Sequence, residues 1–199
     1  MSSDIDTLIT VLILAGGRGK RVGGEDKGLL IIAGQPLVSL VLGKFNDTYS
    51  KIIISANRNL DVYRRYGLPV QQDITPGFQG PLTGISSIID QVTSPYMLVL
   101  PCDMPNLPTN IGHRLLQKLN DSDYHIAVVH DGQRLQPLCC LLSTSLGNSL
   151  RSYLSSGQRR VDQWILQQPH IIVDFSDEAA AFTNINNTTD ITAFVDLTQ

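Results

Sequence analysis

The sequence predicts a three-layer α/β fold in which a mainly parallel sheet carries helices on both faces. Short runs of β-branched and other apolar residues alternate with longer amphipathic stretches, as strands and helices alternate in such folds. The short runs are apolar on both faces, which is typical of strands covered by helices. A chain of 199 residues fits one large domain better than two small ones. We therefore expect a single domain over residues 1–199, with residues 1–7 as a disordered tail.

Four runs have the composition of strands in the interior of a parallel sheet. They are Thr10–Ala15, Lys51–Ser55, Tyr96–Leu100 and His125–Val129. Leu29–Ile32 forms a further short extended segment. In the last third, a turn near Asp131-Gly132 precedes Leu135–Leu142, which predicts a strand antiparallel to its partner, and Ile171–Phe175 predicts another strand.

Amphipathic stretches between these runs predict helices. The first begins near Pro36, because proline is favoured in the first turn of a helix, and extends to about Phe45. The other helices are expected at about Leu60–Tyr66, Leu82–Gln91, Pro108–Leu119, Thr144–Leu154, Arg159–Gln167 and Asp190–Leu197.

Charge is balanced over the chain and positive only locally. The formal net charge is −3, so no overall basic field attracts nucleic acid, and we expect no nucleic-acid partner. Between Arg18 and Lys27, four cations stand against two anions. This local excess suits a small anionic ligand better than a polyanion.

Cysteine usage and the N-terminal residues indicate a cytoplasmic protein. Cys102, Cys139 and Cys140 form no CxxC or zinc-type cluster, and reduced thiols are the simplest interpretation. The neighbours Cys139 and Cys140 should point to opposite faces of their strand. The apolar run Leu8–Ala15 is far shorter than the ~20 residues that span a membrane. Acidic residues precede it where a signal peptide carries positive charge, so we expect no membrane association.

A glycine-rich loop follows the first predicted strand directly. Residues 16–24 contain five glycines, which permit positive φ and let several backbone N–H groups face one anion. Arg21 and Lys27 can add charge-assisted hydrogen bonds. Ligands of parallel α/β sheets bind at the carboxyl ends of the strands. A solvated surface loop is the alternative, but the position after a buried strand favours an anion site.

Two well-known phosphate-binding patterns do not match this loop. A Walker A loop has the spelling G-x-x-x-x-G-K-[ST], whereas Gly19-Lys20 is followed by Arg21 and the first glycine is replaced by Leu14. A dinucleotide fingerprint has G-x-G-x-x-G, whereas the segment from Gly17 ends in Val22. Both patterns are excluded.

The string LAGGRGKRVGGEDKG, residues 14–28, resembles the signature of the nucleotidyltransferases that activate sugar phosphates and cofactors. Within that superfamily, the double glycine Gly16-Gly17 and the segment Gly23–Gly28 are most similar to the molybdenum cofactor guanylyltransferases. The related cytidylyltransferases more often have Ala-Ala-Gly after the leucine. The resemblance implies a Rossmann-like sheet of the nucleotide-diphospho-sugar transferase type. It also implies Mg²⁺-dependent transfer of GMP from GTP to molybdopterin, with release of pyrophosphate.

The same resemblance implies roles for the loop residues. Leu14, Ala15, Gly16 and Gly17 would surround the guanine and ribose with backbone atoms. Arg21 and Lys27 would lie along the phosphates as catalytic cations. Lys27 is the strongest single candidate for a functional residue.

A second constellation, Pro101-Cys102-Asp103-Met104-Pro105, follows the predicted strand Tyr96–Leu100. A carboxylate at this position faces the same crevice as the glycine-rich loop, and Mg²⁺ needs one or two carboxylates beside water and phosphate oxygens. Asp103 is therefore a candidate metal ligand and catalytic residue. A turn aspartate that caps local backbone is the alternative, and the resemblance, which includes a C-D-x-P segment, favours the metal site. Cys102 is expected to be a packing residue.

Three smaller segments hold further candidate residues: Asn57 follows a predicted strand, Asp73 follows the short segment 70–72, and Gly80–Gly84 precedes a predicted helix. The resemblance implies that Asn57 contacts the nucleotide and that Asp73 lies near the base or ribose. In the segment Gly80–Gly84, a base or second substrate can approach the backbone closely. The candidate residues in this segment are Gly80, Pro81 and Gly84. Each segment, taken alone, is more often a turn or a helix cap than a binding site.

The last third holds residues that the resemblance assigns to the metal or to the second substrate. Asn184 and Asn186 belong to an N-I-N segment, with a simple turn as the alternative. Arg159 and Arg160 are candidate ligands of the pterin phosphate, and an exposed basic pair at a helix start is the other interpretation.

Two other functions remain open from the sequence. One is a related nucleotidyltransferase that uses CTP or UTP, or that acts on a sugar phosphate. The other is a non-catalytic GTP-binding regulatory module. For the favoured function, the expected partners are proteins of molybdopterin synthesis and the molybdoenzymes that receive the product. The protein is expected to be a monomer.

Overall fold

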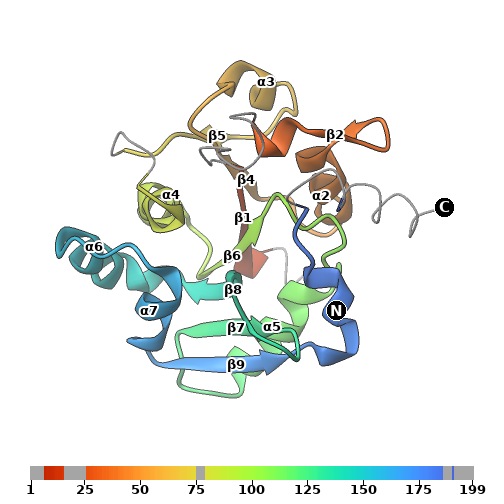
Figure 1. Cartoon of the computed structure of the whole chain (residues 1–199). Coiled ribbons are helices and arrows are strands. Elements are labelled where there is room, and N and C mark those ends of the chain that lie inside the picture. The colour runs from red at the N-terminus through yellow and green to blue at the C-terminus, as the bar shows by residue number, and fades with distance from the viewer. Residues whose placement is uncertain (1–6, 16–25, 75–78, 186–189, 191–199) are drawn as a thin grey trace.

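The computed structural model describes residues 7–15, 26–74, 79–185 and 190. Within these residues, the central sheet has seven strands in the order β5-β4-β1-β6-β8-β7-β9, and β2 and β3 form a separate small sheet (Figure 1). The strands of the central sheet are β1 (Ile9–Leu14), β4 (Ile52–Ser55), β5 (Val70–Gln71), β6 (Tyr96–Pro101), β7 (Ile126–His130), β8 (Leu135–Ser143) and β9 (His170–Asp174). The small sheet contains β2 (Ile31–Ile32) and β3 (Gln35–Pro36).

The sheet is mainly parallel, as the sequence predicts. β1 pairs in parallel with β4 on one side and with β6 on the other, and β4 with β5 and β7 with β9 are also parallel. β8 runs antiparallel to both of its neighbours, β6 and β7, which confirms the predicted antiparallel strand. The chain leaves β1 first toward β4 and later returns to its other side as β6, so the switch point lies between β1 and β6.

Helices cover both faces of this sheet. Figure 1 shows α4, α6 and α7 on one side and α2 and α5 on the other. The α-helices are α2 (Leu37–Phe45), α3 (Leu60–Arg64), α4 (Pro81–Ile88), α5 (Ile111–Asn120), α6 (Gly147–Ser155) and α7 (Val161–Leu166). Short 3₁₀ turns are η1 (Lys27–Leu29), η2 (Ile89–Gln91), η3 (Thr144–Leu146) and η4 (Ser176–Phe182).

Two apolar cores, one on each face, hold the three layers together. Successive residues of a strand point to opposite faces, and β1 follows this rule: Val11 belongs to the core under α2 and α5, and Leu12 to the core under α4, α6 and α7. Cys139 and Cys140 divide between the two cores in the same way, which confirms their predicted opposite orientation. No helix in the described part of the chain is long and apolar enough to cross a membrane.

Several element boundaries differ from the predictions. The extended segment predicted at Leu29–Ile32 is a 3₁₀ turn followed by strand β2, which pairs with β3 across Ala33 and Gly34, both with positive φ. The helix predicted from Pro108 begins at Ile111, and the one predicted from Arg159 begins at Val161. The sequence did not predict β5 or η4, because two-residue strands and single 3₁₀ turns carry almost no periodic signal. The helix predicted at Asp190–Leu197 and the tail at 1–7 lie largely outside the described residues.

Candidate nucleotide-binding site

A cavity of about 160 Å³ opens at the carboxyl edge of β5, β4, β1 and β6. Its lining includes all of the predicted nucleotide-binding residues that the structure describes: Leu14, Ala15, Lys27, Asn57, Asp73, Gly80, Pro81, Gly84 and Asp103. The other lining residues are Ser55, Pro101, Cys102 and Leu138, none of which was predicted to bind the nucleotide. The predicted loop residues Gly16, Gly17 and Arg21 lie outside the described residues.

Lys27 and Asp103 form an ion pair at one end of this cavity. The Lys27 Nζ atom donates to Asp103 Oδ2 at 2.5 Å, and the two side chains are 21% and 16% exposed. Lys27 begins η1, and Asp103 lies two residues after β6. The other carboxylate oxygen, Asp103 Oδ1, is buried and accepts no hydrogen bond from the residues that the structure describes. An acceptor oxygen in this state suits a ligand that brings its own positive charge or donor.

Asn57 and Asp73 form a second polar pair, at the β4 and β5 end of the cavity. The Asn57 amide donates to Asp73 Oδ2 at 2.9 Å, and the backbone N–H of Asp73 donates back to Asn57 Oδ1 at 2.9 Å. Burial raises the pKa of Asp73, and the hydrogen bond from Asn57 opposes that rise. Asp73 is thus a half-buried acceptor whose position is fixed by Asn57.

The start of α4 forms one wall of the cavity. Gly80 has φ of 104°, a conformation that side chains rarely adopt, and Pro81 occupies the first turn of α4. One turn later, a Cβ atom at Gly84 would lie 2.7 Å from Ser55 Oγ and 3.3 Å from Asp73 Oδ1. A glycine at position 84 therefore lets α4 approach Asp73 closely enough to close the cavity.

Asn184 lies beside Asp103, on the other side from the nucleotide cavity. It lines a second cavity of about 270 Å³, which shares Pro101, Asp103 and Leu138 with the first. The backbone N–H of Ile185 donates to the Asp103 carbonyl at 2.9 Å, which fixes this segment beside the ion pair. Asn186, predicted for the same role, lies outside the described residues.

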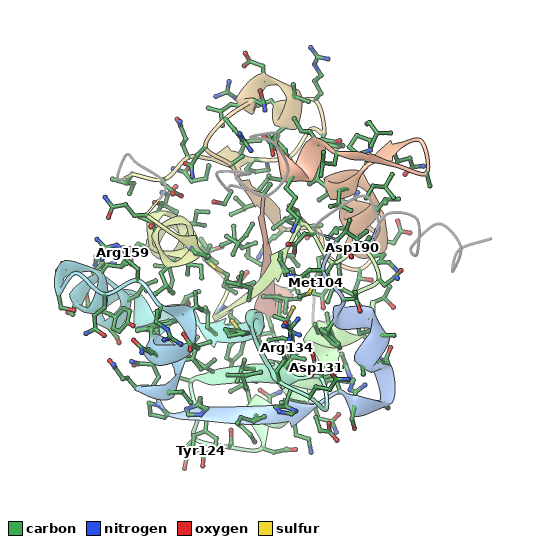
Figure 2. The ribbon with its side chains drawn as sticks, in the orientation of Figure 1. Met104, Tyr124, Asp131, Arg134, Arg159 and Asp190 are labelled. Carbon is green, nitrogen blue, oxygen red and sulfur yellow. The ribbon has the colours of Figure 1, made fainter. Side chains whose placement is uncertain are left out.

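The structure does not gather Arg159 and Arg160 around this second cavity. The Arg159 guanidinium donates to the Gln79 side chain at 2.7 Å, and the Arg159 backbone carbonyl lies 3.9 Å from the position of a Cβ atom at Gly80. Figure 2 shows Arg159 on the side of α4 and α6, well apart from Met104 and Arg134, which line the second cavity. Arg160 is largely exposed and pairs with Asp162 at 2.5 Å. Their assignment to the second substrate stays a prediction.

The three cysteines are packing residues. All are buried, and burial raises the pKa of the Cys140 thiol to about 12 and also raises the pKa of Cys102 and of Cys139. Neutral buried thiols are poor nucleophiles. Cys102 therefore shapes the cavity floor beneath Asp103, as the sequence predicts, without taking part in chemistry.

Comparisons with known proteins agree with this geometry. Residues 11–171 match the family described as the MobA-like NTP transferase domain. A molybdenum cofactor guanylyltransferase of Mannheimia succiniciproducens is 43% identical over 183 residues, which cover 92% of this chain and 96% of that protein.

Solved structures share the fold. Molybdopterin-guanine dinucleotide biosynthesis protein A from Archaeoglobus fulgidus has a TM-score of 0.81 at 19% identity, covering 95% of this chain and 98% of its own. The 2-C-methyl-D-erythritol 4-phosphate cytidylyltransferase from Thermus thermophilus has a TM-score of 0.70 at 15% identity, with coverage of 94% and 97%. The sequence matches decide between these two classes, and the chain belongs to the molybdenum cofactor guanylyltransferase family of nucleotidyltransferases.

Proposed function

We propose that this chain transfers GMP from GTP to molybdopterin, with Mg²⁺, and releases pyrophosphate. The observation that carries the proposal is the Lys27–Asp103 pair at the end of a cavity whose walls come from four strand ends and α4. The similarity in sequence to guanylyltransferases across 92% of the chain supports GTP as the donor and molybdopterin as the acceptor.

The order of strands suggests how the nucleotide lies. Along the sheet edge, Asp73 and Asn57 follow β5 and β4, Ala15 follows β1, and Asp103 follows β6. The neutral and acceptor groups of Asn57 and Asp73 suit the donors of a base edge or ribose hydroxyls. The cation of Lys27 suits a phosphate. GTP would then lie across β4 and β1, with its phosphates toward Lys27 and Asp103.

The residues of this site fit a magnesium ion held jointly with a nucleotide. Mg²⁺ is usually held by one or two carboxylates together with substrate phosphates and water. Asp103 Oδ1 is a buried carboxylate oxygen to which no described residue donates, and Asn184 offers an amide oxygen in the adjoining cavity. When bound there, the ion would neutralise charge that develops on the α-phosphate.

The transfer itself needs positioning more than proton abstraction. The phosphate of molybdopterin is largely ionised near neutral pH, so its oxygen can attack the α-phosphorus directly. The bond between that phosphorus and the bridging oxygen of pyrophosphate then breaks, and pyrophosphate leaves with the bonding electrons. Lys27 would offset repulsion between the two anions and stabilise the transition state. The wall that the two cavities share at Asp103 would hold the attacking phosphate in line with the bond that breaks.

Pyrophosphate release with each of the four nucleotides, with and without molybdopterin, tests the proposal. We expect release with GTP that depends on molybdopterin. Selective turnover of CTP or UTP, or of a sugar phosphate, would establish a different nucleotidyltransferase. GTP binding without release under any condition would establish a regulatory module. Cytoplasmic location, a monomeric state and contacts with molybdoenzymes stay predictions alongside this one.

A further inference from the structure

Asp26 is the neighbour of Lys27 in the sequence, but its side chain turns toward α3 and does not line the nucleotide cavity. Asp26 is only 8% exposed. Its carboxylate accepts hydrogen bonds from the Tyr63 hydroxyl at 2.8 Å and from the Asn59 amide at 2.9 Å. The Arg58 Nε atom lies 3.6 Å from Asp26 Oδ2. A buried carboxylate is costly unless it is paired and hydrogen-bonded, and the segment 58–63 meets both needs.

Gly28, on the other side of Lys27, rests on the same tyrosine. A Cβ atom at this position would collide with the Tyr63 hydroxyl, so the backbone can lie against the ring only with glycine there. The Leu29 N–H donates to the Asp26 carbonyl at 3.0 Å and closes the turn. Both neighbours of Lys27 are therefore fixed to α3, while Lys27 itself lines the cavity.

Asn59 adopts an unusual conformation in making its bond to Asp26. Its φ of 51° and ψ of 33° are left-handed, a region that asparagine tolerates better than most residues. At the start of a helix, an asparagine side chain usually caps the first turn. Here it forms no cap hydrogen bond with α3, and its amide donates to Asp26. The hydrogen bond to Asp26 thus takes the place of the helix cap that an asparagine at this position usually forms.

We propose that Asp26 is a positioning residue, which through Tyr63 and Asn59 holds the turn 26–29 so that Lys27 Nζ reaches the phosphates and Asp103. The inference rests on the proposed function, because its effect on catalysis passes through Lys27. Asp26 itself touches neither substrate.

Kinetics of three variants measure the effect. Asp26→Asn preserves shape and removes the charge, and we expect kcat/KM for GTP to fall about 10- to 100-fold, as for other residues that orient a reacting group. Tyr63→Phe and Asn59→Gly each remove one donor and should cost about 3- to 10-fold. Glycine adopts the left-handed backbone readily, so Asn59→Gly should fold normally. Asp61→Asn, an exposed position on the same helix, is the matched control and should leave kcat/KM unchanged.

A double-variant cycle separates positioning from general stability. If Asp26 acts through Lys27, adding Asp26→Asn to Lys27→Met should cost nothing beyond the loss in Lys27→Met alone. A purely structural role predicts the same fold loss in both backgrounds. Equal losses in the two backgrounds, or unchanged kcat/KM in folded Asp26→Asn, would overturn the positioning role.

Chemical labelling gives a result that does not depend on turnover. A small amine-reactive anhydride, with peptide mass spectrometry, reports the reactivity of Lys27 relative to the exposed Lys118. Asp26→Asn should raise labelling of Lys27 about fivefold, as expected when a restraining hydrogen-bond network is weakened, and leave Lys118 unchanged. Unchanged Lys27 labelling would contradict the proposal even in an enzyme that proved to use another substrate. An inactive wild type with increased labelling would overturn the proposed function and leave the positioning of Lys27 supported.

Discussion

The ammonium group of Lys27 lies 2.5 Å from the carboxylate of Asp103, although 76 residues separate them. Lys27 follows β1 and Asp103 follows β6, and these strands are neighbours on either side of the switch point. The pair places a cation and a carboxylate, the proposed metal ligand, at one end of the proposed nucleotide cavity. Most of the function that we propose depends on this relationship.

Removal of either partner should disable the enzyme without unfolding it. We expect Lys27→Ala and Asp103→Ala each to lower turnover about 100-fold or more, since each removes an electrostatic group at the reacting phosphates. Lys118→Ala, an exposed lysine on α5, is the control and should retain full activity. Pyrophosphate release by purified, folded variants measures the effect. Activity within a few-fold of wild type in both variants would refute these roles.

Titration with Mg²⁺ tests both the proposed magnesium requirement and its assignment to Asp103. Chelation should abolish turnover, and added Mg²⁺ should restore it. Asp103→Asn keeps the shape and lowers the charge, so its activation should need a higher Mg²⁺ concentration than wild type. The same Mg²⁺ dependence in both proteins would place the ion elsewhere.

Gly84 and Gly43 form a matched pair of helical glycines. At Gly84, a Cβ would lie 2.7 Å from Ser55 Oγ, whereas nothing lies within 4 Å of a Cβ at Gly43 in α2. We expect Gly84→Ala to lower the free energy of unfolding by about 1–3 kcal/mol and to weaken GTP binding. Gly43→Ala should raise the free energy of unfolding by about 0.5–1 kcal/mol. Urea unfolding and calorimetric GTP binding measure both effects, and similar behaviour of the two variants would contradict the close packing of α4.

Asp73 should make stability depend on pH. Burial raises the pKa of Asp73 in the folded protein above its ordinary value of 3.8, so the folded state holds the proton more tightly than the unfolded state. The stability that this provides is present below the unfolded pKa and is lost as pH rises through the folded pKa. Asp73→Asn removes this titration and keeps an acceptor for Asn57.

The variant should therefore gain stability relative to wild type as pH rises from 4 and then reach a plateau, while its affinity for GTP falls. Urea unfolding at a series of pH values from 4 to 8 checks the trend. A variant that loses stability relative to wild type over this range would show that Asp73 is favoured as a carboxylate.

The main features of the fold and the central pair could be predicted from the sequence. Asp103 lies just after a buried strand and Lys27 lies at the end of the loop that follows another, and the carboxyl ends of parallel strands meet at one edge. The strand pattern therefore predicts the edge at which both lie, and the family resemblance singles out Lys27. The cavity also contains Asn57, Asp73 and Gly80 as predicted. Asn57 follows a predicted strand and Gly80 precedes a predicted helix, whereas Asp73 follows β5, which the sequence did not predict, and was expected there from the family resemblance.

Contacts made by side chains of short elements could not be predicted. The bond between Asp26 and Tyr63 depends on where α3 rests, and that five-residue helix has no periodic pattern that fixes its position. The hydrogen bond of Arg159 to Gln79 beside α4 was likewise not predicted, and the role of Arg159 at a pterin phosphate stays a prediction. Such partners are selected by tertiary packing, which a charge pattern in the sequence does not record.

Identification of the product is the most direct test of the central claim. The enzyme would be incubated with molybdopterin, Mg²⁺ and GTP that carries a label in its guanine. Mass spectrometry would then identify the products, and a parallel assay would measure pyrophosphate. We predict a molybdopterin species carrying the labelled GMP, formed with one pyrophosphate for each molecule. The absence of a GMP adduct, or an adduct formed preferentially from CTP, would contradict the account.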